Sequence, residues 1–271
     1  MIVDGRAIAQ KIKGELKKEI EDFGFRPKLV AVQVGHNPAS ESFLKIKKRV
    51  GEEVGILVEV ISLPDEIQEE ELVRVIEENN DDGSVHGIIV QLPLPPGLNK
   101  EKVLGSIDQA KDPDLLSGKK TTVNSPVVSA IEEILQSAKV NLTDKKIVVL
   151  GYGDLVGKPV AKWLKQMGIS PFIINGSNSQ ADLSAEALAK ADLIISGAGS
   201  PGIITSEKIK TGVVVIDAGT SEQGGRLLGD LDSGAHDKCL LYTPVPGGVG
   251  PVAVAVLFKN LAVLARKTRN G

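Results

Sequence analysis

The sequence has few of the residues from which metal centres and disulfides are built. Its 271 residues include one cysteine, Cys239, and three histidines, at positions 36, 86 and 236. A lone cysteine cannot form an intramolecular disulfide or supply a cysteine-rich zinc site, and the histidines lie in separate segments. We therefore expect no bound metal, no disulfide and no chemistry led by histidine.

The sequence also lacks an excess of positive charge and an evident targeting segment. Its 32 basic and 35 acidic residues give a formal charge of −3, so nucleic acid and anionic membranes are not expected partners. The N-terminus has no charged-then-apolar signal, and we expect no apolar run to be long enough to span a membrane. Together with the single cysteine, these absences predict a soluble protein of the reducing cytoplasm.

Aromatic residues make up only 3% of the chain, whereas glycine occurs 29 times. This composition favours aliphatic α/β layers over an aromatic-rich sandwich. A length of 271 residues, against roughly 100–200 residues for a typical domain, predicts two domains.

The order of hydrophobic patterns predicts two α/β units with parallel strands and right-handed crossovers. In the first half we expect helices at 7–22, 40–54 (with Ser40 as N-cap) and 68–79, and strands at 28–34, 56–63 and 86–92. In the second half we expect helices starting at 126 and spanning 156–167, 184–190 and 249–267, and strands at 146–150, 171–174, 192–196 and 213–217.

The domain boundaries follow from this order. The segment 111–122 is the most linker-like, and the last helix is expected to pack back on the first unit. We therefore assign residues 1–116 and 249–271 to a first domain, and residues 117–248 to a second one.

A glycine-rich turn follows the strand expected at 146–150. Gly151, Gly153 and Gly157 form the pattern G-x-G-x-x-x-G, one residue longer than the usual dinucleotide-binding fingerprint. Glycines there let the chain turn tightly and let backbone amides approach a pyrophosphate at a helix N-terminus. The strand-turn-helix context favours a dinucleotide site; the alternative is a turn that serves only close packing of the helix on the sheet.

One lysine stands in an apolar stripe. Phe43, Lys47, Val50 and Val54 share one face of the helix expected at 40–54. A lysine held against a core loses hydration, which lowers its pKa toward values useful for acid–base catalysis. The alternative is a lysine whose ammonium group extends past the stripe into water.

Three further segments carry unusual polar or backbone features. Gln91 ends a strand before a proline-rich turn, where ligands bind in open parallel sheets, although it could be an ordinary strand-end glutamine. Lys111–Asp114 (KDPD) brings two carboxylates to the segment between the units, with a solvated turn as the alternative. Thr243–Pro251 (TPVPGGVGP) fixes an unusual backbone whose amides could contact phosphate or nicotinamide, or could only stiffen the chain.

Together these strings resemble the bifunctional methylenetetrahydrofolate dehydrogenase/methenyltetrahydrofolate cyclohydrolase family. The strings that carry the resemblance are VGHNPAS (34–40), VQLPLP (90–95), KDPD, GYGDLVGKP (151–159), VVVIDAG (213–219) and TPVPGGVGP. Their order and approximate spacing agree over nearly the whole chain. The resemblance implies a folate-binding catalytic domain, a Rossmann-like domain for NAD(P) and usually a homodimer.

The same resemblance implies two reactions on tetrahydrofolate derivatives, within one-carbon metabolism and purine biosynthesis. The first oxidises 5,10-methylenetetrahydrofolate with NAD(P)+ to 5,10-methenyltetrahydrofolate. The second hydrolyses that product to 10-formyltetrahydrofolate.

The resemblance also implies roles for individual residues. Lys47 is similar to the family's catalytic lysine, Gln91 to the glutamine that partners it, and Asp114 to the aspartate that holds the pterin. The other implied substrate contacts are Phe43, Pro93, Pro246, Gly247 and Gly248. The implied cofactor contacts are Gly151, Tyr152, Gly153, Asp154, Val156, Gly157, Asn175, Ser177, Gly219 and Thr220.

The chain departs from the family's usual pattern near the expected catalytic residues. Phe43 stands where the family usually has a tyrosine, so a hydroxyl is missing one helical turn from Lys47. This difference bears on the cyclohydrolase step more than on hydride transfer. After Asp114 the chain reads Leu115–Ser117 (LLS) in place of Gly-Phe-His-Pro, and it is shorter before the next helix.

It departs again in the expected cofactor site. Tyr152 and Gly153 replace a frequent arginine and serine, Asp154 adds a negative charge near the phosphates, and Asn175–Ser177 brings no basic residue. A 2′-phosphate favours an arginine, and NAD usually favours an acidic residue at the end of the second strand. We expect NADP from the family's habit, with NAD as the alternative.

Three other functions agree with parts of this pattern. One is a monofunctional NAD(P)-dependent methylenetetrahydrofolate dehydrogenase with weak or absent cyclohydrolase activity. Another is a non-catalytic folate- or nucleotide-binding module. A third is another two-domain dehydrogenase, such as a shikimate type, against which the string TPVPGGVGP argues.

Overall fold

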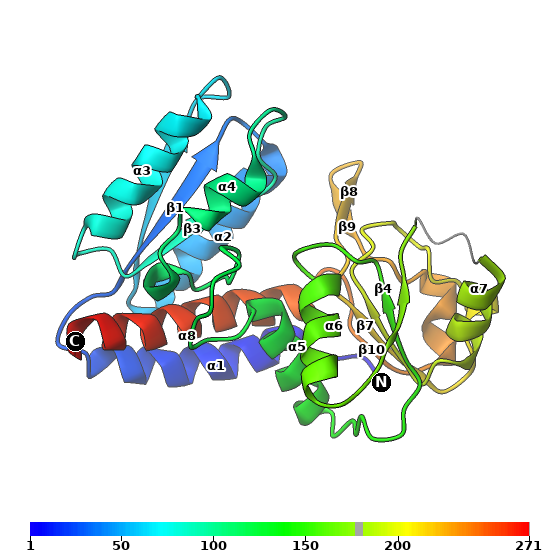
Figure 1. Cartoon of the computed structure of the whole chain (residues 1–271). Helices are drawn as coiled ribbons and strands as arrows, with labels where there is room; N and C mark the ends of the chain where they lie inside the picture. The colour runs from blue at the N-terminus through cyan, green and yellow to red at the C-terminus, as the bar shows by residue number, and fades with distance from the viewer. Residues whose placement is uncertain (177–180, 271) are drawn as a thin grey trace. The chain divides into compact units, whose positions relative to one another are not determined.

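The computed structural model describes residues 1–176 and 181–270 and divides the chain into two units. The three-stranded unit comprises Gln10–Pro126 and Val254–Gly271, and the five-stranded unit comprises Met1–Ala9 and Val127–Ala253. Figure 1 shows their elements. The expected fold class, two α/β units with the last helix returning to the first of them, is confirmed.

The three-stranded unit has a parallel sheet in the order β2-β1-β3. Its strands are β1 (Lys28–Val34), β2 (Leu57–Leu63) and β3 (Gly87–Val90). Its helices are α2 (Pro38–Val54), α3 (Glu69–Asp81), α4 (Lys100–Gly105) and the 3-10 turn η1 (Gln109–Lys111), with most of α1 (Gly5–Glu21) and α8 (Val249–Asn270).

Alternate side chains of β1 enter two different cores. Leu29 and Ala31 pack with apolar residues of α1, α2 and α8, among them the fully buried Phe258. Val30 and Val32 pack on the opposite face with residues of α3 and α4. Both faces of the sheet are therefore covered by helices, as buried parallel strands require.

The five-stranded unit has a parallel sheet in the order β10-β7-β6-β4-β5. The strands are β4 (Ile147–Leu150), β5 (Phe172–Ile174), β6 (Leu193–Ser196), β7 (Val213–Asp217) and β10 (Cys239–Tyr242), and β8 (Ser221–Gln223) pairs with β9 (Arg226–Leu228) in a hairpin. The helices are α5 (Pro126–Ser137), α6 (Gly157–Gln166) and α7 (Ala181–Lys190), with 3-10 turns η2 (Ser206–Lys208) and η3 (Ser233–Lys238).

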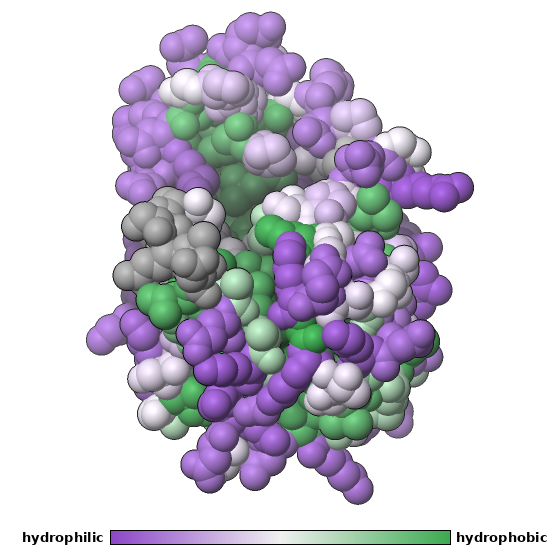
Figure 2. Space-filling model, turned by 90° about the vertical axis from the view of Figure 1, so that its right-hand side faces the viewer, coloured by the Kyte–Doolittle hydropathy of each residue, from purple (hydrophilic) through white to green (hydrophobic). Residues whose placement is uncertain are grey.

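The N-terminal residues belong to this second sheet rather than to the first unit. Ile2 forms a parallel bridge with Tyr242 of β10, Val3 N donates to the Tyr242 carbonyl, and Tyr242 N donates to the Met1 carbonyl. Figure 2 shows the molecule from the right-hand side of Figure 1. Hydrophilic residues cover much of this face and apolar residues show between them, as on ordinary protein surfaces.

Two expectations about helices were wrong. The N-cap of α2 is Asn37, whose side chain accepts from Ser40 N, because Pro38 supplies the favoured first position of the helix. Within α8, residues Val249–Lys267 are long and apolar enough to cross a membrane by length and composition. Most of that stretch is buried in the structure, and a core helix meets the same test.

Candidate active site

Two polar side chains meet at the carboxyl end of β3. Lys47 projects from α2, and its Nζ donates to Oε1 of Gln91 over 2.9 Å. Gln91 directly follows β3, and its backbone N–H still donates to the Val32 carbonyl of β1. The sheet therefore fixes Gln91, and α2 brings Lys47 to it. The half-buried Phe43 lies one turn earlier on the same helix.

The amide of Gln91 has only one useful orientation. Its Nε2 donates to the Leu92 carbonyl over 2.9 Å, which leaves Oε1 to face Lys47. The buried Ser40 donates its hydroxyl to the same carbonyl over 3.3 Å, and a cis peptide joins Leu92 to the exposed Pro93. Backbone and side chain thus hold an acceptor toward the lysine.

Burial lowers the pKa of the Lys47 ammonium, and the charge of Asp114 opposes that shift. Burial also raises the pKa of the Asp114 carboxyl, which the charge of Lys47 opposes and that of Asp112 reinforces. The charged form of each group is thus disfavoured by lost hydration and supported by the other. A lysine extended freely into water is excluded by this environment.

Asp114 lies within a tight turn. Asp112 is fully buried, and its carboxylate accepts the backbone N–H groups of Leu116 and Ser117. Leu115, directly after Asp114, has a φ of 58°, a left-handed conformation that is uncommon for leucine. The turn around Asp112 therefore fixes the backbone on both sides of Asp114, and the solvated-turn interpretation does not hold.

The glycine turn after β4 leaves no room for a side chain at two of its three glycines. Gly151 has a φ of 85°, and a Cβ there would lie 2.6 Å from the Gly197 carbonyl oxygen. A Cβ on Gly157, the first residue of α6, would lie 2.1 Å from the Gly151 carbonyl oxygen. Gly153 is exposed and has open space around it. Such a turn before a helix N-terminus fits a dinucleotide pyrophosphate.

The other expected cofactor residues surround this turn or follow neighbouring strands. Asp154 is paired with Lys158 of α6 over 2.6 Å, so its negative charge is balanced locally. Tyr152 is half-buried beside it, and Val156 precedes α6 as its N-cap. Asn175 is exposed after β5, whereas Ser177 lies outside the described residues.

Sequence reasoning missed a pair of buried acids in the five-stranded unit. Asp230 accepts from the Ser196 hydroxyl and from the backbone N–H groups of Ala198 and Ser200. Asp217, at the end of β7, accepts from the N–H groups of Gly219 and Leu231. The acids thereby tie together the loops that follow β6, β7 and β9. The sequence signal that could have identified Asp217 is an acidic residue at the end of an apolar strand.

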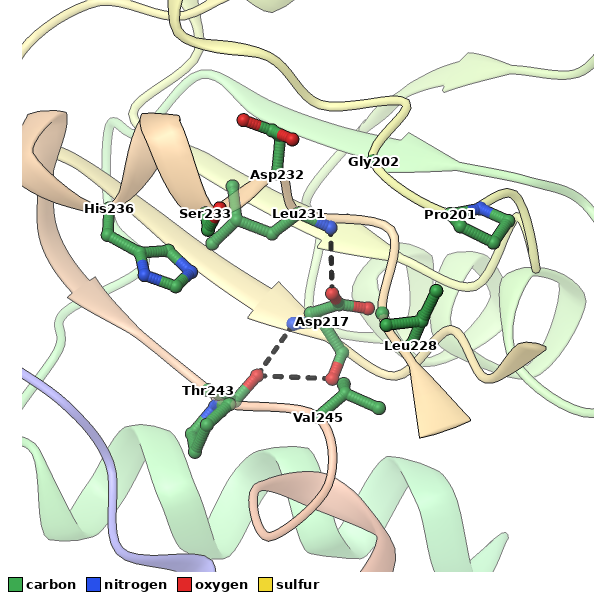
Figure 3. Close-up of a pocket in the computed structure, with 12 residues that line it drawn as sticks. Pro201, Gly202, Asp217, Leu228, Leu231, Asp232, Ser233, His236, Thr243 and Val245 are labelled. Carbon is green, nitrogen blue, oxygen red and sulfur yellow. Dashed lines mark hydrogen bonds between the residues drawn. The ribbon is translucent and has the colours of Figure 1, made fainter. Parts of the chain in front are cut away.

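Thr243 connects the end of β10 to the end of β7. Its hydroxyl accepts from Asp217 N over 2.7 Å and donates to the Asp217 carbonyl over 3.1 Å (Figure 3). Asp217 and Thr243 line a cavity of about 370 Å³ together with His236 and Asp232. Because both oxygens of Asp217 already accept backbone N–H groups, this cavity is less suited to chemistry than the pair Lys47 and Gln91.

The segment after Thr243 is held by its own backbone. Gly248 N donates to the Pro244 carbonyl over 2.7 Å, so this amide is not available to a ligand. Gly247 has a φ of 112°, and a cis peptide precedes the exposed Pro246. A Cβ on Gly5 would lie 1.9 Å from the Gly248 carbonyl oxygen, so the N-terminal residues pack closely on this segment.

The structure therefore brings Lys47, Gln91 and Asp114 together in the three-stranded unit. The glycine turn, Gly219, Thr220 and the segment Pro246–Gly248 lie in the five-stranded unit. Among the described residues, no group of three or more His, Cys, Asp or Glu side chains could hold a metal ion.

Comparison with known proteins matches both parts of the chain to one family. Residues 3–114 match the family described as tetrahydrofolate dehydrogenase/cyclohydrolase, catalytic domain, and residues 125–269 match its NAD(P)-binding domain. The bifunctional protein FolD of Staphylococcus epidermidis is 37% identical over 287 residues, covering 100% of this chain and 98% of that protein.

Two solved structures are similar over the whole chain. The bifunctional enzyme FolD of Campylobacter jejuni has a TM-score of 0.91 at 33% identity, covering 98% of this chain and 99% of that one. The Trypanosoma brucei FolD, solved with NADP and an inhibitor, has a TM-score of 0.92 at 32% identity and covers 100% and 99%.

The Lys47 environment predicts the effect of removing its opposing charge. We expect Asp114→Asn to lower the pKa of Lys47 further, because the carboxylate that favours the ammonium form is lost. NMR titration of methylated lysines would measure the pKa of Lys47 in wild type and in Asp114→Asn. Glu66→Gln removes an exposed acid of the same unit and serves as the control; an unchanged or raised pKa of Lys47 in Asp114→Asn would contradict the assignment.

Asp217 predicts a pH dependence of stability. Burial raises the pKa of its carboxyl to about 7 in the folded protein, against about 4 when unfolded. Between these two pH values Asp217 keeps its proton in the folded state and loses it in the unfolded state. The contribution of Asp217 to the free energy of unfolding is therefore full below pH 4 and is lost as the pH rises to about 7. The loss is about 4 kcal/mol at most.

We expect Asp217→Asn to flatten this dependence in urea unfolding measured between pH 4 and 8. Asp232→Asn, which changes a partly exposed acid of the same cavity, should keep the wild-type slope. Equal slopes for wild type and Asp217→Asn would show that Asp217 titrates normally.

Proposed function

The chain belongs to the tetrahydrofolate dehydrogenase/cyclohydrolase family, and on that premise we propose that it catalyses both reactions. It would oxidise 5,10-methylenetetrahydrofolate with NAD(P)+ and hydrolyse the resulting 5,10-methenyltetrahydrofolate to 10-formyltetrahydrofolate. The observation that carries the proposal is the contact between Lys47 Nζ and Gln91 Oε1 in an environment that lowers the pKa of the lysine.

The hydrolytic step needs a base that tolerates a cation. The methenyl carbon is electrophilic and carries positive charge, so a neutral amine is compatible with it whereas an ammonium is not. Lys47 would take a proton from water as the new C–O bond forms. Collapse of the adduct then breaks the bond between the carbon and N5 as the adduct hydroxyl loses its proton and becomes the formyl carbonyl on N10. N5 takes up one proton, and the other leaves to solvent, which returns Lys47 to its neutral form.

Gln91 would orient this base without protonating it. A neutral lysine that donates one N–H to Gln91 Oε1 keeps its lone pair for the proton of water. Because the Leu92 carbonyl holds the amide of Gln91, the acceptor stays directed at the amine. Asp114 would hold the pterin ring, as the resemblance implies.

Hydride transfer depends on alignment, since a bound nicotinamide supplies the hydride acceptor. The glycine turn and the N-terminus of α6 would hold the pyrophosphate. Asn175, Ser177, Gly219 and Thr220 are the further cofactor contacts that the resemblance implies. We propose NADP, supported by the T. brucei relative solved with NADP, and keep NAD as the alternative.

We further propose how the parts divide the work. Residues 1–116 and 249–271 would bind folate, with Phe43 and Pro93 among the substrate contacts, and residues 117–248 would bind the cofactor. The resemblance also implies substrate contacts from Pro246, Gly247 and Gly248. A homodimer in the cytoplasm is the assembly and location that the family resemblance supports.

Lys47→Met tests the assigned base. We expect methenyl hydrolysis to fall at least about 100-fold, because a general base contributes roughly that much, while oxidation of the methylene substrate continues. Spectroscopic decay of the methenyl compound and reduction of NADP and NAD would measure the two steps. Lys48→Met changes an exposed lysine of the same helix and should leave both rates near wild type. Intact hydrolysis in Lys47→Met would refute the role of Lys47, and no turnover by wild type would favour a binding module.

Phe43 favours one alternative, a dehydrogenase with weak cyclohydrolase activity. We expect Phe43→Tyr to raise methenyl hydrolysis roughly two- to tenfold, the value of one added hydrogen bond near the reacting groups. Phe23→Tyr, also half-buried in the three-stranded unit, is the matched control. An unchanged rate in Phe43→Tyr would mean that the missing hydroxyl does not limit hydrolysis.

A further inference from the structure

Each of the three residues before Asp114 is anchored by a different part of the three-stranded unit. The buried Lys111 donates its Nζ to the Asn79, Asn80 and Asp82 carbonyls at the end of α3, over 3.2, 2.6 and 2.8 Å. The Asp112 carboxylate accepts from the turn that follows. The Pro113 carbonyl accepts from Asn260 of α8.

Asn260 closes this segment at both ends with one nitrogen. Its Nδ2 donates to the Pro113 carbonyl over 2.9 Å and to the Asn124 carbonyl over 2.8 Å. A side-chain amide nitrogen has two hydrogens, so both are used. The residues in between, 114–123, include Asp114 and the stretch that is shorter than in the family's usual pattern.

The helix that carries Asn260 is fixed in the core. Asn260 is only 7% exposed, and its neighbours Phe258, Leu261 and Ala262 are fully buried in the cluster that covers one face of the sheet. Leu261 also packs on the first residue of β3, since a Cβ on Gly87 would lie 2.2 Å from its side chain. The strand that precedes Gln91 and the carbonyl next to Asp114 are therefore located by adjacent residues of one helix.

We infer that Asn260 is a positioning residue for the folate site: by holding the Pro113 carbonyl to α8, it sets the location of the Asp114 carboxylate relative to Lys47 and Gln91. The inference rests on the proposed function for its effect on substrate. The effect of Asn260 on the distance between Asp114 and Lys47 is independent of the proposed function.

Loss of the amide would release two carbonyls at once, the buried carbonyl of Pro113 and the part-buried carbonyl of Asn124. A buried carbonyl without a donor is costly, so the backbone at 113 would shift to find a new partner. Asp114 is the next residue after Pro113 and would move with it. Displacements of about 1 Å at a binding group can change rates by as much as 100-fold, whereas the glycine turn in the other unit contains none of these contacts.

The test compares Asn260→Leu, which has a similar size and no donor, with Lys119→Met. Lys119 donates to the Ile107 carbonyl and so anchors the same segment away from Pro113. We expect Asn260→Leu to raise the KM for 5,10-methylenetetrahydrofolate about tenfold or more and to leave the KM for the nicotinamide cofactor within about twofold. Lys119→Met should leave both KM values near wild type. Asn260→Ser, which keeps one donor, carries the same test with a smaller rise if Asn260→Leu does not fold.

A second readout does not depend on turnover. Movement of Asp114 away from Lys47 should lower the pKa of Lys47 in the Asn260 variants but not in Lys119→Met, as followed by NMR of methylated lysines. If wild type shows no turnover, the proposed function fails, and this titration alone decides the inference. Folded Asn260 variants with an unchanged Lys47 titration, or with both KM values raised equally, would overturn it.

Discussion

The removal of one amine from water is the constraint on which the candidate site depends. Burial of Lys47 disfavours its charged form, and the neutral amide of Gln91 orients the amine without adding a charge that would hold the proton. The charge of Asp114 opposes this shift. A fully hydrated lysine would stay protonated, and one paired directly with a carboxylate would bind its proton more firmly. The pKa of Lys47 lies below that of either, because lost hydration outweighs the opposing charge of Asp114.

The three-stranded unit provides the rigid reference for this balance. Gln91 continues the ladder of β3 against β1, and the Leu92 carbonyl fixes its side-chain amide. Lys47 comes from α2, a helix that covers one face of the same sheet. Asp114 has no strand of its own and depends on the turn around Asp112 and on α8. The polar groups are therefore placed by elements distant in sequence, and the last helix joins this unit through its buried apolar residues.

The five-stranded unit uses buried charge for a different purpose. Asp217 and Asp230 are withdrawn from water and accept backbone N–H groups from the loops that follow β6, β7 and β9. The cost appears as the raised pKa of Asp217. Lost hydration thus lowers the pKa of a lysine in one unit, whereas in the other unit buried carboxylates hold loops together by hydrogen bonds.

The sequence by itself determined the two α/β units, the helix stripe that contains Lys47 and the glycine turn, because periodicity and glycine spacing are local properties of the chain. It placed the N-cap of α2 wrongly, since Asn37 and Ser40 are both good caps and the choice depends on Pro38. Only the tertiary structure decided which groups meet. The contact of Lys47 with Gln91 and the hold of Asn260 on the backbone beside Asp114 join residues 44 and 147 positions apart. Such pairings are set by how helices pack on a sheet, which no local pattern encodes.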